Sequence, residues 1–85
     1  MKVTFTPTFI RIYKNLPKQL QQETKEKITL FETDQNHPFL KTHKLKGKLK
    51  GRYSFSVNYR YRVVFMYSST SQVTLLTVGD HDVYK

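Results

Sequence analysis

The stretch "RYSFSVNYRYRVVFMYSSTSQVTLLTV", residues 52–78, places three segments with strand character in direct succession. Residues 52–58 alternate aromatic or aliphatic side chains with serines, which is typical of a strand with one buried face. Residues 61–67 and 72–78 are apolar on both faces, as the central strands of a sheet are. The polar segment 67–72 favours a hairpin turn between them. These patterns predict that the second half of the chain forms consecutive antiparallel strands.

The first forty residues predict one more strand and two helices. Residues 2–5 alternate apolar and polar side chains, as a half-buried strand does. Thr6 can cap a helix that has proline at its first position and runs to about Asn15. A second helix is expected between Pro17 and the turn-forming residues that precede Pro38. The order β-α-α-β-β-β predicts an α+β domain with a helical hairpin packed on one antiparallel sheet.

Apolar residues at helical spacing identify the helix faces that should pack on the sheet. The 85 residues are expected to form a single domain, residues 1–85, and a hydrophobic content of 38% is enough for a folded core. The expected core consists of Phe9, Ile10, Tyr13 and Leu16 in the first helix, Leu20, Thr24, Ile28 and Phe31 in the second, and Phe55, Val63, Phe65 and Leu75 in the sheet.

Several function classes are excluded by composition. The chain has no cysteine, so disulfides, thiolate zinc sites and cysteine nucleophiles are excluded. His37, His43 and His81 show neither HxxxH nor HxH spacing, so no metal and no other cofactor is expected. No stretch approaches the length of a membrane span, and residues 1–9 lack the apolar block of a signal peptide. A cytoplasmic protein without a membrane partner is therefore expected.

Positive charge is concentrated in one part of the chain. The formal net charge is +9, and residues 41–62 carry eight basic and no acidic side chains. Lys44, Lys46, Lys48 and Lys50 alternate there ahead of Arg52. Such a block attracts polyanions or an acidic polypeptide. The alternative is a solvated surface that only keeps the protein soluble.

Two arginines and two residues near the end of the chain are candidates for chemistry. Arg60 and Arg62 are two positions apart in an expected strand, so their guanidinium groups should share a face. Two neighbouring cations repel unless an anion lies between them, and a phosphodiester is the obvious candidate. The alternative is that both lie on the solvent face of an edge strand. His81 and Tyr84 follow the last strand, where side chains can project from the end of the sheet, although chain termini are often frayed.

The chain resembles the RelE/ParE superfamily of bacterial and archaeal toxin–antitoxin systems. The resemblance rests on the element order and on "LKGKLKGRYSFSV" (residues 45–57), "YRVVF" (61–65) and "VGDHDVY" (78–84), and it covers essentially the whole chain. Within the superfamily it is nearest to RelE, YoeB and YafQ, the ribosome-dependent mRNA interferases. It implies the toxin of a type II system, a metal-independent endoribonuclease that cleaves mRNA and thereby inhibits translation.

The resemblance also implies a set of catalytic residues. Arg62 matches the arginine that contacts the scissile phosphate, and His81 matches the terminal histidine of YafQ-like members, a candidate acid or base. Tyr84 matches a terminal aromatic residue that stacks on or orients RNA, and His43 matches a second active-site histidine.

The match is not complete, and this leaves the general base open. YafQ-like members have a further histidine and an aspartate where this chain has Ser56 and Arg60. RelE-like members carry an arginine near the position of His81, and the glutamate base of YoeB-like members has no counterpart. We therefore expect His81 as general acid, and as base either His43 or a lysine whose cationic neighbours lower its pKa. Arg62, aided by Arg60 or Arg52, should stabilise the transition state.

The partners implied are a cognate acidic antitoxin, the ribosome and mRNA, with oligomers formed only through the antitoxin. The residues expected to bind RNA phosphates, without reading sequence, are Lys44, Lys46, Lys48, Lys50, Arg52 and Arg60. Two other functions remain open. One is inhibition of DNA gyrase, as in the ParE branch, and the other is a non-catalytic basic module that binds RNA or protein.

Overall fold

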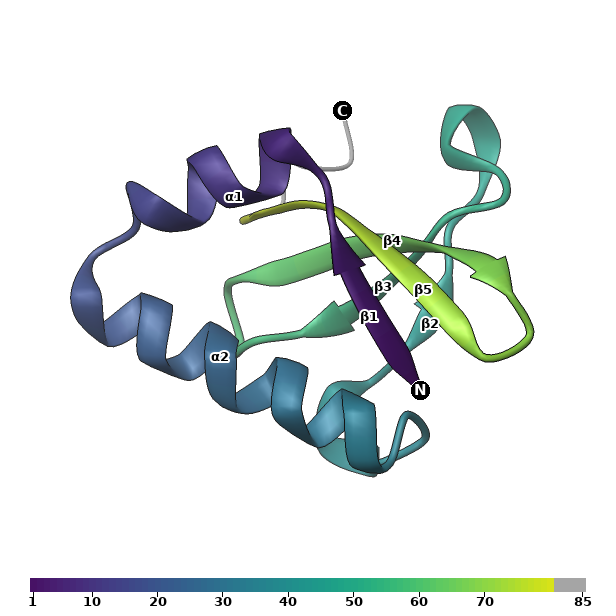
Figure 1. The fold of residues 1–85 in the computed structure, drawn as a ribbon, viewed down its shortest axis with the longest axis horizontal. Coiled ribbons are helices and arrows are strands. Elements are labelled where there is room, and N and C mark those ends of the chain that lie inside the picture. Colours follow the sequence, from purple (N-terminus) through teal and green to yellow (C-terminus); the bar gives the residue numbers. More distant parts are fainter. Residues whose placement is uncertain (81–85) are drawn as a thin grey trace.

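Two helices cover one face of a five-stranded sheet in the computed structural model of the chain, which describes residues 1–80 apart from the side chain of Lys48 (Figure 1). The helices are α1 (Pro7–Lys14) and α2 (Lys18–Thr33), and two short 3-10 helices are η1 (Pro38–Leu40) and η2 (Gly47–Leu49). The strands are β1 (Lys2–Phe5), β2 (His43–Lys44), β3 (Tyr53–Ser56), β4 (Arg62–Ser69) and β5 (Gln72–Gly79).

The sheet is mixed, because one edge strand runs parallel to its neighbour. The strand order is β1-β5-β4-β3-β2, and the last four form antiparallel neighbours. β1 pairs in parallel with β5, with Val3 opposite Val73. The expected α+β class and helical hairpin are confirmed, but the expectation of a wholly antiparallel sheet is wrong. Hairpin turns impose antiparallel pairing, and β1 and β5 are joined by the rest of the domain instead of by such a turn.

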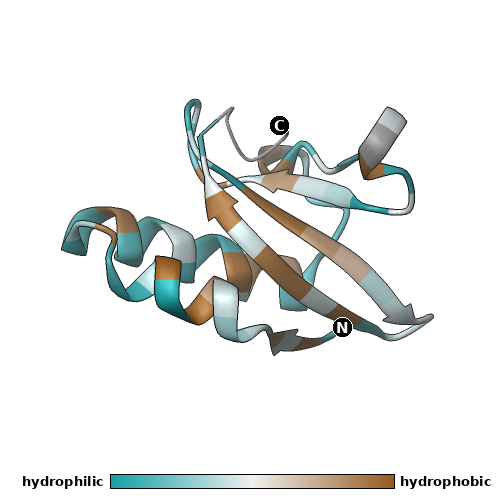
Figure 2. Cartoon of the chain, turned by 90° about the horizontal axis from the view of Figure 1, so that it is seen from above, coloured by the Kyte–Doolittle hydropathy of each residue, from teal (hydrophilic) through white to brown (hydrophobic). Residues whose placement is uncertain are grey.

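The helix-facing side of the sheet holds the core, as expected. Phe31 of α2 is fully buried, and its ring centroid lies 4.9 Å from that of Phe55 and 5.0 Å from that of Phe65. The other core residues expected on the second helix and the sheet are also buried or half-buried: Leu20, Thr24, Ile28, Val63 and Leu75. Figure 2 shows the hydrophobic bands along the strands and on the helix faces turned toward them.

Helix α1 begins as the sequence predicts, but one of its expected core residues is exposed. The Thr6 hydroxyl accepts a hydrogen bond from the Phe9 backbone N–H at 3.1 Å, which caps the helix. Phe9 is buried, whereas Ile10 is 41% exposed and Ile12 is half-buried. Residue 12 continues the i, i+3, i+4 stripe that starts at Phe9, and residue 10 lies about 100° away from it. The expectation of a buried Ile10 was therefore wrong.

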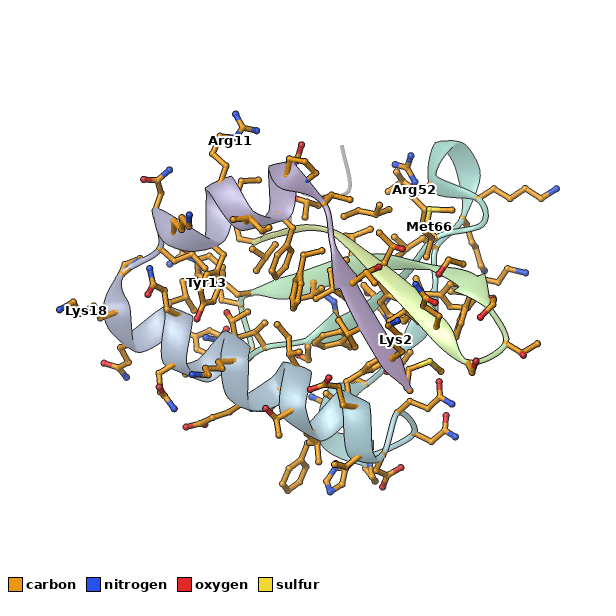
Figure 3. All side chains as sticks on the ribbon, in the orientation of Figure 1. Lys2, Arg11, Tyr13, Lys18, Arg52 and Met66 are labelled. Atoms are coloured by element: carbon orange, nitrogen blue, oxygen red, sulfur yellow. The ribbon has the colours of Figure 1, made fainter. Side chains whose placement is uncertain are left out.

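The polar side chains of the helical hairpin hold its two helices together. Gln21 Nε2 donates hydrogen bonds to the carbonyl oxygens of Tyr13, Lys14 and Leu16, at 3.0–3.2 Å. The Tyr13 hydroxyl in turn donates to the Gln21 carbonyl at 3.3 Å, and Figure 3 shows this side chain turned toward α2. The Gln21 amide thus contacts carbonyl groups at and just beyond the end of α1, where intrahelical partners run out.

Candidate active site

Arg62 and His43, two of the expected catalytic residues, lie within hydrogen-bonding distance of each other. Arg62 Nη2 is 3.3 Å from His43 Nδ1. The same nitrogen donates to the Lys41 carbonyl oxygen at 3.2 Å, and Nε donates to the Ser54 hydroxyl at 3.2 Å. Three contacts thus hold the guanidinium through two of its nitrogens, Nε and Nη2.

Strand register places these side chains on the face of the sheet that the helices do not cover. His43 of β2 pairs with Ser54 of β3, and Arg62 at the start of β4 pairs with Ser56 of β3. Residues opposite each other, and residues two apart in a strand, point to the same side of a sheet. Phe55 lies between the two serines and points into the core. The site therefore occupies the outer face, at the edge formed by β2 (Figure 1).

Lys41 contributes its backbone carbonyl through an unusual conformation. Its φ of 46° and ψ of 45° are left-handed, and within residues 1–80 it is the non-glycine residue with positive φ. This conformation costs a residue other than glycine about 1–2 kcal/mol. It ends η1 and turns the chain so that the carbonyl oxygen lies 3.2 Å from both Arg62 Nη2 and His43 Nδ1. Such strain is commonly retained at functional sites.

The tautomer of His43 depends on which of its two neighbours it engages. If Nδ1 accepts from Arg62, the proton of the neutral ring is on Nε2. If Nδ1 instead donates to the Lys41 carbonyl, Nε2 carries the lone pair and is free to take up a proton. His43 is exposed, so either form can reach a substrate. The three groups together can bind an anion and accept a proton.

The expected lysines extend from the short strand β2 into the turn that follows it. Lys44 is in β2, while Lys46 and Lys50 flank η2, and all three are exposed. The buried Leu45 anchors this turn, and its N–H donates to the Arg52 carbonyl at 2.8 Å. Figure 1 shows the turn projecting beyond the edge of the sheet. The cations consequently surround a protruding loop next to the Arg62 site.

Arg60 does not share a strand face with Arg62, and that expectation was wrong. Residues 57–61 form a loop between β3 and β4. The Asn58 side-chain oxygen accepts hydrogen bonds from the N–H groups of Arg60 and Tyr61, at 2.9 and 2.7 Å. An Asx turn of this kind bends the chain where an extended strand was expected. Arg60 is therefore an exposed cation near the site and is not aligned with Arg62.

Arg52 is exposed directly before β3. The other expected residues, His81 and Tyr84, lie outside the described residues, as does the side chain of Lys48. Strand β5 ends at Gly79, which pairs with Arg62 of β4. Sequence reasoning missed the roles of Ser54 and Lys41. The alternation of serines in residues 52–58 indicated a polar strand face, but it gave no sign that Ser54 would be fully buried beneath an arginine.

Residues 1–80 contain neither a metal-binding cluster nor a helix suited to a membrane. No three or more histidine, cysteine, aspartate or glutamate side chains of this range are grouped so that they could hold a metal ion. No helix in it is sufficiently long and apolar to cross a bilayer.

Known proteins resemble the chain in structure but not in sequence. No family model and no curated protein matches it. The YoeB/ParE toxin from Agrobacterium tumefaciens matches with a TM-score of 0.77 and 18% identity over 95% of this chain and 99% of that one. YafQ from E. coli gives 0.78 and 15% over 96% and 94%, and YoeB–YefM from Staphylococcus aureus gives 0.74 and 22% over 95% and 97%. The chain has the fold of RelE/ParE superfamily toxins, as its sequence predicted.

Proposed function

We propose that the chain is the toxin of a type II toxin–antitoxin system and cleaves mRNA on the ribosome without a metal ion. The observation that carries the proposal is the cluster of Arg62, His43 and the Lys41 carbonyl on the open face of the sheet. It combines an anion-binding fork with an imidazole, beside a loop of exposed lysines. The fold shared with YoeB and YafQ adds support.

The reaction requires three groups. A base removes the proton of a ribose 2′-hydroxyl, whose oxygen attacks the adjacent phosphorus and forms a cyclic phosphate. Cations neutralise the charge that builds on the phosphate oxygens, and an acid protonates the departing 5′-oxygen. Arg62 supplies the cation, because a guanidinium can bind two phosphate oxygens at once.

His43 is the proposed base, and its contact with Arg62 determines which ring nitrogen carries the proton. When Arg62 turns to the phosphate, it releases His43 Nδ1. Exchange with solvent water then moves the ring proton from Nε2 to Nδ1, which donates to the Lys41 carbonyl 3.2 Å away, and the Nε2 lone pair is left to take the 2′-hydroxyl proton. Substrate binding and activation of the base are thereby coupled. A nearby lysine remains the alternative base.

His81 is the proposed acid, and its substitution should slow the chemical step. An imidazole has an ordinary pKa of about 6.5 and can donate a proton at cellular pH. We expect His81→Gln to slow single-turnover cleavage of ribosome-bound mRNA by about 10²-fold or more, with unchanged ribosome binding. Tyr84→Phe should have a much smaller effect than Tyr84→Ala, because stacking survives loss of the hydroxyl. Normal cleavage by His81→Gln together with inactivity of Tyr84→Phe would assign the acid to the tyrosine.

The lysine loop is proposed to bind RNA phosphates, and salt dependence tests this role. Replacing Lys44, Lys46, Lys48 and Lys50 by glutamine should weaken ribosome or RNA binding and flatten its dependence on salt, by about 0.7 in the log–log slope for each phosphate that is no longer neutralised. The matched control neutralises four exposed lysines elsewhere: Lys2, Lys14, Lys18 and Lys25. Figure 3 shows Lys18 at the opposite end of the molecule from Arg52. If the two sets of substitutions have equal effects, the lysine loop contributes only through the net charge of the protein and is not a specific binding site.

An acidic antitoxin is the proposed partner, and the cytoplasm the proposed location. The solved YoeB–YefM complex from Staphylococcus aureus and the RelBE2 complex from Mycobacterium tuberculosis each pair a toxin of this fold with an antitoxin. A net charge of +9 with eight cations in residues 41–62 favours an acidic segment as the neutralising partner. A short acidic reading frame beside the gene would supply it, and absence of any such partner would count against the proposal.

One experiment separates this function from gyrase inhibition. The chain is expressed under tight control, and mRNA integrity is followed together with markers of DNA damage. Rapid loss of mRNA cut within translated regions supports the proposal. DNA damage with intact mRNA would assign the gyrase function, and the absence of both effects would leave a non-catalytic binding module.

A further inference from the structure

A hollow adjoins the Arg62 site at the open edge of β3. It is lined by Lys27, Phe39, Lys41, Ser56, Val57, Asn58 and Tyr59, and has a volume of about 280 Å³. Strand β2 pairs only with residues 53 and 54 of β3, so the edge beyond them is left for this hollow. Lys41 and Ser56 belong both to this hollow and to the Arg62 site. The Lys41 carbonyl accepts a hydrogen bond from Arg62, and Ser56 of β3 pairs with Arg62 of β4.

Two aromatic side chains at this hollow are unusually exposed. Tyr59 is 95% exposed and Phe39 is 70% exposed, the two highest values among the large hydrophobic side chains of residues 1–80. Single exposed apolar residues are ordinary on protein surfaces. Two exposed aromatic rings at one hollow, from segments twenty residues apart in sequence, need another explanation. Neither ring is buried enough to contribute much to the stability of the folded chain.

The backbone that carries Tyr59 is firmly held although the ring is free. Asn58 Oδ1 accepts from the N–H groups of residues 60 and 61, and Asn58 Nδ2 donates to Glu23 Oε2 of α2 at 3.1 Å. The Ser56 hydroxyl donates to the Asn58 carbonyl at 2.8 Å, and the Val57 N–H donates to the Tyr61 carbonyl at 2.9 Å. A ligand that stacks on Tyr59 therefore does not have to order the loop first.

Phe39 is positioned by the 3-10 helix η1. Its backbone N–H donates to His37 Nδ1 at 3.1 Å. The two rings meet edge to face, with centroids 4.8 Å apart. This contact supports one side of Phe39 and leaves most of its surface open. Both aromatic residues are thus presented on fixed backbone at the rim of the same hollow.

The charges at the hollow favour an anion beside the rings. Lys27 and Lys41 line it, and Arg62 lies next to it, whereas the nearby acid Glu23 is engaged by Asn58. Aromatic faces combined with cations are the recurring means of binding unpaired nucleotides. The volume is slightly below the range of about 300–1,000 Å³ of pockets that enclose drug-sized ligands, which suits a single base.

We propose that this hollow binds one unpaired base of the RNA, next to the phosphate that Arg62 holds. The base stacks on Tyr59 and Phe39, and Lys27 and Lys41 bind the adjoining phosphate. The proposal rests on the proposed function only for the choice of RNA as the ligand. The observations that support it, the exposed rings and the cations at the hollow, are independent of the Arg62–His43 contact. The hollow would fix the position of the RNA strand relative to Arg62. The lysine loop cannot do this alone, because it contacts only the repeating phosphates.

Binding of two probes of equal charge tests the proposal. One is a single-stranded RNA of about six nucleotides, within the range of ~4–16 that such grooves bind, and the other is the same backbone without bases. We expect the wild-type chain to prefer the strand with bases by about ten-fold or more, since stacking of a base on an aromatic ring adds affinity that a bare backbone cannot supply. Tyr59→Leu and Phe39→Leu should each remove most of this preference without changing the salt slope. Tyr59→Phe should retain it.

Charge variants and a control complete the design. Lys27→Gln and Lys41→Asn should lower the salt slope by about 0.7 each and keep the preference for bases. Asparagine is chosen at position 41 because it tolerates the left-handed conformation. Phe5→Leu is the matched control, because Phe5 is 47% exposed on β1 and lies outside this hollow. Its binding should equal that of the wild-type chain.

Failure of this proposal can be told from failure of the proposed function. Equal binding of both probes, binding of neither, or unchanged binding by Tyr59→Leu overturns the stacking site, whatever the chain does to mRNA. Displacement of the RNA by a polyglutamate peptide whose own binding requires Tyr59 would also overturn it and assign the hollow to an acidic protein. Base-dependent binding through Tyr59 in a chain that cuts no ribosome-bound mRNA would leave the stacking site standing and refute the cleavage function.

Discussion

Phe31→Ala should lower the free energy of unfolding by about 3–5 kcal/mol, the usual cost of removing a fully buried phenylalanine. Phe31 is fully buried and packs on Phe55 and Phe65 with ring centroids about 5 Å away. Alanine would leave a cavity between α2 and the centre of the sheet. Because a domain of this size is stable by only about 5–15 kcal/mol, this loss should remove a large fraction of its stability.

Urea unfolding followed by circular dichroism measures the effect. Phe31→Leu fills most of the same space and should cost distinctly less than Phe31→Ala. Phe39→Ala is the matched control, because its ring is 70% exposed, and its stability should stay within about 0.5 kcal/mol of the wild-type chain. A destabilisation below about 1 kcal/mol for Phe31→Ala would mean that α2 does not pack on the sheet as described.

The core was predictable because periodicity alone identifies which faces are apolar. The face that contains Leu20 and Phe31 and the alternation around Phe55 needed no knowledge of the fold. The direction of β1 was not predictable in this way. An isolated edge strand gains similar burial in either direction, and its partner β5 lies at the far end of the chain. Its orientation therefore follows from the packing of the whole domain.

Arg62 and His43 are candidates that the sequence and its resemblance named, but the contact between them was not predictable. It depends on β2, which has two residues and is too short to show any periodicity. It also depends on Lys41 in a left-handed conformation, which nothing in a lysine side chain foretells. The Asx turn at Asn58 separated Arg60 from Arg62 by competing with strand pairing for the same backbone groups. Local hydrogen bonds thus decided the site, whereas hydrophobic periodicity decided the fold.

Arg62→Ala should slow cleavage of ribosome-bound mRNA by about 10²–10³-fold or more, the usual cost of losing one preorganised group that stabilises transition-state charge. Ribosome binding should change little, because the exposed lysines are proposed to supply most of the affinity. Arg62→Lys should restore only a small part of the rate. An ammonium keeps the charge but lacks the planar fork that contacts Ser54 Oγ and the Lys41 carbonyl together and that the proposed mechanism also places on a phosphate.

Arg60→Ala is the matched control for this experiment. It removes the same charge from an exposed loop residue that lies two positions before Arg62. Single-turnover cleavage and ribosome affinity are measured for both variants, with urea unfolding to verify that each is folded. If the charge near the phosphate is all that matters, the two variants will lose activity alike. If the geometry built by Lys41 and Ser54 matters, Arg62→Ala alone will lose the chemical step, because in the proposed mechanism only Arg62, which contacts both Ser54 and His43, binds the phosphate and releases the base. Equal loss of binding and cleavage in Arg62→Ala would instead make it one more phosphate anchor, and the base would then have to be sought among the lysines.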